Sequence, residues 1–267
     1  MKKNLLLVIA ILFTGTLSAQ FYISAKVGYG FGAQKTVLGQ TSTYGTSSEN
    51  NWGSLGQSFA PALKLGFLAN DNLGFELGLN YFMGAELTAY DVTTPLGSLM
   101  ATAKSNQFRI IPSFVYKTDI GIYGKFGLVL PVSGSTVVNM EETEVATATT
   151  TNTEITTYGM FSVGYSGVVG YNLSLNDNMN LFFELEYLGL NIKANNSEVT
   201  ALIINEADNL LGMDEYTKKT EFVDKLTPIS NNEEWNTNFD RSKPKEELRT
   251  VKGYSSFGIN VGFTYSF

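Results

Sequence analysis

From residue 254 to the C-terminus, large apolar and small polar side chains alternate along the chain. This period of two residues is that of a β-strand. A soluble sheet would bury the apolar face in a core. A membrane barrel would present it to lipid and turn the small polar face toward the lumen. The apolar face consists of Phe257, Ile259, Val261, Phe263, Tyr265 and Phe267.

Seven earlier stretches alternate in the same way, and the connections between the eight stretches are short and long in turn. Short periplasmic turns, long extracellular loops and an even number of strands are typical of a transmembrane barrel. The pattern therefore predicts an all-β chain, an eight-stranded antiparallel transmembrane β-barrel. The strands lie at about 21–32, 56–68, 73–83, 107–116, 120–132, 158–172, 181–187 and 254–267. The turns lie at 69–72, 117–119 and 175–178, and the long connections at 33–55, 85–104, 133–157 and 191–252.

Several local features refine this prediction. Pro61 removes a ladder donor, so we expect a local distortion there. The repeated Asn-Asp-Asn at 70–72 and 176–178 indicates two equivalent turns, with a calcium site as the less favoured alternative. Because successive side chains of a strand point to opposite faces, Lys64 and Glu76 can both face the lumen only if the turn within 69–72 has an odd number of residues.

The long connections differ from one another in composition. The segments 33–55 and 85–104 are polar and are predicted to be loops, whereas the Thr-rich segment 133–157 is predicted to extend strands five and six into a protruding hairpin. In the fourth connection, at 191–252, Ser197 could cap a helix that Gly212 ends. Asp214 to Leu226 could form a second helix before Pro228, so that a helical cap would lie over the barrel mouth.

The first 19 residues have the pattern of a secretory signal peptide. Lys2 and Lys3 precede a short apolar run that ends before Leu17-Ser18-Ala19-Gln20. The run is too short to span a bilayer as a helix. We expect cleavage after Ala19, which leaves 20–267 as one barrel domain, exported to the cell outer membrane.

Composition excludes several kinds of chemistry. The 267 residues include neither Cys nor His, so thiolate chemistry, His-ligated metals and Ser-His-Asp catalysis are excluded. We predict no enzymatic activity, catalytic residue, metal or cofactor. Since Lys2 and Lys3 are two of the 18 basic residues, the mature chain has 16 basic and 25 acidic residues, a net charge of −9, which argues against nucleic-acid binding.

Charged residues also occur on the faces predicted to line the lumen. An eight-stranded barrel is just wide enough inside for its own side chains, so these charges should pair in one layer and plug the barrel. The alternative is a gate or a selectivity ring. The predicted lumen charges are Lys26, Lys64, Glu76, Arg109, Lys125, Glu184 and Glu186.

The mature chain resembles the small eight-stranded outer-membrane barrels of the OmpX, OmpW and OmpA-barrel type. The resemblance rests on the ending at 258–267, on the segment 125–131 and on the loop asymmetry. It implies that Phe263, Tyr265 and Phe267 belong to a C-terminal assembly signal that the barrel-assembly machinery reads. It also implies that lipid and lipopolysaccharide surround the barrel. Two functions remain open: a structural or surface-interaction role with an unknown loop ligand, or an OmpW-like narrow transporter for small or hydrophobic molecules.

Overall fold

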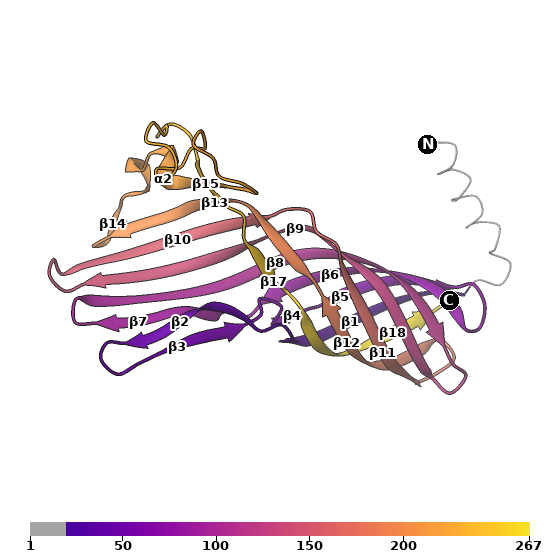
Figure 1. Cartoon of the computed structure of the whole chain (residues 1–267). Helices are drawn as coiled ribbons and strands as arrows, with labels where there is room; N and C mark the ends of the chain where they lie inside the picture. Colours follow the sequence, from indigo (N-terminus) through magenta and orange to yellow (C-terminus); the bar gives the residue numbers. More distant parts are fainter. Residues whose placement is uncertain (1–19) are drawn as a thin grey trace.

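The computed structural model describes residues 20–267, and in this range eight strands pair in a closed antiparallel ring (Figure 1). Each strand hydrogen-bonds to the next, and the last pairs with the first. The prediction of an eight-stranded barrel is confirmed, while the predicted signal peptide lies outside the described residues. Around the ring the strands are β1 (Gln20–Gly32), β5 (Ala62–Leu68), β6 (Leu73–Gly84), β8 (Gly97–Lys117), β9 (Ile122–Glu144), β11 (Gly164–Ser174), β12 (Met179–Gly189) and β18 (Ser256–Ser266).

Strand β18 shows how the alternating sequence forms this wall. Its apolar residues from Phe257 to Tyr265 are exposed, and the small residues between them are buried in the lumen. Val261 lies opposite Val27 of β1 on one side and Phe183 of β12 on the other. Because the ring satisfies backbone hydrogen bonds internally, it can lie in lipid. The apolar face is therefore the lipid-facing surface.

Two of the tight turns use the same side-chain chemistry, as the repeated Asn-Asp-Asn predicts. Asn70 Oδ1 accepts hydrogen bonds from the backbone N–H groups of Asn72 and Leu73, at 3.0 and 2.7 Å. Asn176 Oδ1 does the same for Asn178 and Met179, at 3.0 and 2.8 Å. The backbone pairing of Ala69 with Leu73 leaves a three-residue turn, so the predicted odd length is confirmed.

Pro61 interrupts its strand, as predicted. The short strand β4 (Ser58–Phe59) ends before it and β5 resumes at Ala62. The register does not change across the break, since Phe59 pairs with Met83 and Ala62 with Asn80. The proline removes a donor without altering which side chains face the lumen.

Beyond the ring, the extracellular connections contain more strand than the sequence predicts (Figure 1). The segments 33–55 and 85–104, predicted to be loops, contain strands and the start of β8. Their Thr, Val and Tyr residues favour strands. The predicted extension of β9 is confirmed, but strand six breaks at 160–163. The extracellular strands are β2 (Thr36–Thr43), β3 (Ser47–Gly53), β7 (Leu87–Thr94) and β10 (Thr149–Gly159).

The fourth connection corrects the prediction of two helices. The segment from Ser197 is part of strand β13 (Asn191–Ile204), which pairs with β10 and buries Ile192, Ala194 and Val199 on one face. The second predicted helix is a single turn, because the chain continues as a strand from Lys219. Residues 205–249 form a lobe that we call the cap lobe. Its elements are β14 (Ala207–Asp208), η2 (Leu210–Gly212), α2 (Glu215–Lys218), β15 (Lys219–Val223) and β16 (Lys245–Leu248), and β17 (Val251–Gly253) leads back to the ring.

Within residues 20–267, no helix is long and apolar enough to cross a bilayer.

Candidate functional site in the barrel lumen

Six of the seven predicted lumen charges lie together in the periplasmic half of the barrel. Lys26 Nζ is 2.6 Å from Glu186 Oε2. Lys64 Nζ is 2.9 Å from Glu184 Oε1, and Lys125 Nζ is 2.8 Å from Glu76 Oε2. The six residues come from β1, β5, β6, β9 and β12, and their side chains are between 0 and 14% exposed. We call these residues the charge network.

Glu184 is the centre of the charge network. Its carboxylate lies 2.9 Å from Lys64 Nζ, 3.0 Å from Lys125 Nζ and 3.7 Å from Lys26 Nζ. The hydroxyl of Tyr123 also donates to it, at 3.0 Å. One carboxylate thus contacts all three lysines, so its removal should affect the whole network.

Sequence reasoning missed the tyrosines that complete this layer. Tyr123 donates to Glu184, and Tyr22 donates to Glu76 at 3.1 Å. Glycines make room for the two rings, because a Cβ at Gly66 or Gly170 would collide with Tyr22 or Tyr123 respectively. The alternation of apolar and polar residues already places both tyrosines on the lumen faces of their strands, and this pattern could have predicted them.

The charge network leaves very little free space. The cavity between its side chains is about 20 Å³, roughly the space for one water molecule. Phe182, which is 1% exposed, fills the lumen beside Lys64, whose Nζ lies 5.3 Å from the ring centroid. Little free space therefore remains in the lumen at this level.

Arg109 corrects the prediction that all seven charges share one layer. Along the β6–β8 ladder, Glu76 lies opposite Ser113 and Arg109 lies opposite Asn80. This separation of four residues corresponds to about 13 Å along the strand. Arg109 therefore lies on the extracellular side of Glu76 and makes no ion pair with the described residues. Its Nε donates to Gln107 Oε1 at 2.9 Å, and its guanidinium stacks 3.8 Å from the centroid of the Phe82 ring.

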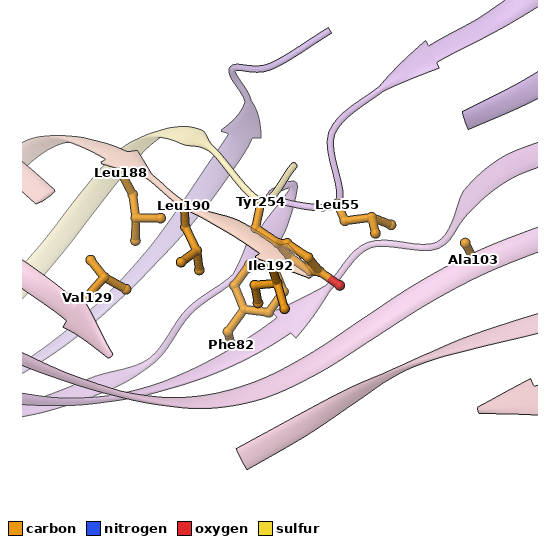
Figure 2. Packing of buried hydrophobic residues seen from close by; sticks show 8 residues of the cluster. All are labelled: Leu55, Phe82, Ala103, Val129, Leu188, Leu190, Ile192 and Tyr254. Carbon is orange, nitrogen blue, oxygen red and sulfur yellow. The ribbon is translucent and has the colours of Figure 1, made fainter. Parts of the chain in front are cut away.

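A cluster of buried apolar side chains packs together on the extracellular side of the charge network, and Figure 2 shows its members. Tyr254 lies in its middle, and its hydroxyl is 2.7 Å from Thr136 Oγ1. The sequence did not predict this cluster because strand ends and the long connections supply much of it. Its buried members are Leu55, Phe82, Ala103, Val129, Leu188, Leu190, Ile192 and Tyr254.

A cavity of about 700 Å³ lies above the apolar cluster, between the extracellular strands. Tyr254, Leu55 and Ile192 belong to both the cluster and the cavity wall. Among the described residues that line the cavity, the charged ones are Lys193 and Lys252. The volume falls within the roughly 300–1,000 Å³ range of small-molecule pockets.

The three residues of the predicted assembly signal lie on the outside of the barrel. Phe263, Tyr265 and Phe267 are exposed, and the rings of Tyr265 and Phe267 meet edge to face with centroids 5.2 Å apart. The Phe267 N–H donates to the carbonyl of Phe21 at 3.0 Å, where the end of the chain meets the start of β1. These residues are therefore accessible at the barrel seam.

Comparison with known families agrees with this architecture. The model of the OmpA-like transmembrane domain matches residues 17–207. The chain belongs to this family. Membership places it in the outer membrane as a transmembrane β-barrel.

Two solved outer-membrane barrels are similar along most of the chain. The structure of OprG from Pseudomonas aeruginosa has 13% identity and a TM-score of 0.45, with 93% of this chain and 96% of that chain covered. Neisserial surface protein A (NspA) has 12% identity and a TM-score of 0.37, with 94% and 99% covered. No curated protein matches the chain. With such low identities and TM-scores, neither structure adds to the family assignment.

Proposed function

We propose that this outer-membrane barrel does not conduct through its lumen and that it acts at the cell surface. In this proposal, the extracellular strands and the cap lobe have a structural or interaction role. The charge network supports it most directly, because three lysines and three glutamates pair in a layer that leaves only about 20 Å³ free. The apolar cluster is a second barrier above it.

The same proposal assigns no enzymatic role to the lumen. The chain has no Cys or His, and the three lumen carboxylates are held in ion pairs. The outward apolar face is expected to contact lipid and lipopolysaccharide, and the seam at Phe267 to contact the barrel-assembly machinery.

Osmotic swelling of proteoliposomes tests the closed lumen. Vesicles that contain the folded protein should swell in isosmotic arabinose no faster than empty vesicles, whereas vesicles with an open porin swell quickly. Swelling well above that of empty vesicles would overturn the proposal.

A second candidate function is the binding of a small apolar molecule, as in an OmpW-like transporter. The observation that favours it is the 700 Å³ cavity, whose wall is mostly apolar. An uncharged fluorophore such as phenylnaphthylamine should bind with increased emission, and Ala101→Trp should reduce binding because Ala101 is buried in the cavity wall. Ala207→Trp, on an exposed strand outside the cavity, is the matched control. Equal binding by both variants would contradict this function.

A further inference from the structure

Arg109 is a buried cation that makes no ion pair with any of the residues that the structure describes. The three lumen glutamates are already paired with Lys26, Lys64 and Lys125. Lys117, at the periplasmic end, stacks on the Tyr22 ring. Arg109 is 2% exposed, and its Nη2 has no hydrogen-bond partner among the described residues. Since a buried charge is costly unless it is paired, this position favours an anion.

Arg109 does not itself line the apolar cavity but is linked to it through Gln107. Gln107, which accepts the hydrogen bond from Arg109 Nε, also lines the cavity. The Phe82 ring under the guanidinium belongs to the same apolar cluster as Tyr254, which forms part of the cavity wall. Rotation of the Gln107 side chain would therefore leave the guanidinium facing a ligand in the cavity.

The charges of the cavity wall have the same sign. Lys193 and Lys252 are its charged lining residues, and none of the described lining residues is acidic. The chain as a whole, in contrast, has a net charge of −7. A mostly apolar wall with only positive charges is complementary to a molecule that has an apolar body and a negative group.

We propose that the cavity binds a long-chain carboxylate, a free fatty acid, with its hydrocarbon tail against the apolar wall and its carboxylate on Arg109. This rests on the second candidate function and names its ligand class. The carboxylate takes the place of the Gln107 oxygen at Nε and also reaches the unpartnered Nη2. Arginine presents these two N–H groups in parallel, which matches the two oxygens of a carboxylate. The exposed lysines contribute less, since water screens them.

Equilibrium dialysis of the folded mature protein in detergent micelles tests this assignment, with protein-free micelles as background. Wild type should bind hexadecanoate at least about tenfold more tightly than hexadecanol, because hydrogen bonds to a charged group contribute that much. Arg109→Gln should remove most of this preference and leave the hexadecanol affinity unchanged. Arg241→Gln, in the exposed part of the cap lobe, is the matched control and should change neither affinity.

The outcomes separate this inference from the function on which it rests. Equal affinity for hexadecanoate and hexadecanol would overturn the carboxylate assignment and leave apolar binding intact. Failure to bind either molecule would overturn both. Loss of the preference in Lys252→Gln but not in Arg109→Gln would also overturn the role of Arg109. If Arg109→Gln does not fold, the comparison of hexadecanoate with hexadecanol on wild type still tests the carboxylate assignment. Arg109→Lys then replaces Arg109→Gln as the variant that tests the role of Arg109.

Discussion

Removal of the Glu184 carboxylate should destabilise the barrel more than removal of any surface carboxylate. After Glu184→Ala, Lys26 still has Glu186 at 2.6 Å and Lys125 still has Glu76 at 2.8 Å. Among the described residues, Lys64 then keeps one acidic neighbour, Glu76, at 3.6 Å. The substitution therefore leaves one buried lysine poorly paired.

The magnitude follows from the burial of Lys64, which is 5% exposed. Breaking a buried ion pair typically costs about 3–5 kcal/mol. The loss of the Tyr123 hydrogen bond adds to this, and water that enters the space left by the carboxylate reduces it. We expect the free energy of unfolding to fall by about 3 kcal/mol or more. Glu142→Ala, on the exposed part of β9, should change it by less than about 1 kcal/mol.

A second substitution distinguishes charge imbalance from lost packing. In Glu184→Ala, the further change Lys64→Met removes the poorly paired charge and leaves two lysines with two glutamates. It should recover at least half of the lost stability. Guanidinium unfolding in phosphocholine vesicles, followed by the gel mobility of folded and unfolded forms, measures both effects. The reasoning is refuted if Glu184→Ala matches Glu142→Ala, or if Lys64→Met lowers stability further.

Three further expectations concern other parts of the molecule. Arg109→Met should leave the melting temperature unchanged or raise it, because it removes a buried charge that makes no ion pair with the described residues. Lys64→Met alone should lower the melting temperature, because Lys64 pairs with Glu184. A lower melting temperature for Arg109→Met would contradict this expectation. Deletion of Phe267 should reduce the amount of folded barrel in the outer membrane, and unchanged amounts would mean that the ending is an ordinary strand. Hydrogen bonds from Thr217 and Arg241 lower the pKa of Asp214 to about 2. Because this pKa is depressed from 3.8, the carboxylate stabilises the N-terminus of α2 fully above about pH 4, and this stabilisation is lost as the pH falls through 2. The chemical shift of the Thr217 amide should titrate with a midpoint near pH 2. A midpoint near pH 4 would argue against the cap.

The ring of strands was predictable because a two-residue period fixes which side chains face lipid. The same parity turned Lys64, Glu76 and Glu184 inward, and the odd-length turn kept the faces consistent from one strand to the next. Alternation, however, gives no position along the barrel axis. For this reason Arg109 was grouped in one layer with Glu76, from which four residues of the β6–β8 ladder separate it.

The extracellular half was less predictable, because long-range pairing rather than local pattern decides its structure. Segment 36–43 becomes a strand by pairing with β3 and, in parallel, with β7. Segment 197–204 has spacings compatible with a helix, but β10 supplies a partner strand for it. Neither partner can be identified from the local sequence alone. The apolar cluster and the cavity depend on these same segments, so sequence reasoning did not find them.

Electrical recording from single barrels in a planar bilayer tests the closed lumen most directly. The folded wild-type protein should show no steady conductance above the bare membrane, since we propose that the charge network and the apolar cluster both block the axis. A detergent blank and an open porin are the controls. A stable, reproducible open state of the wild-type barrel, with an ion selectivity that changes in Glu184→Ala, would contradict the closed lumen.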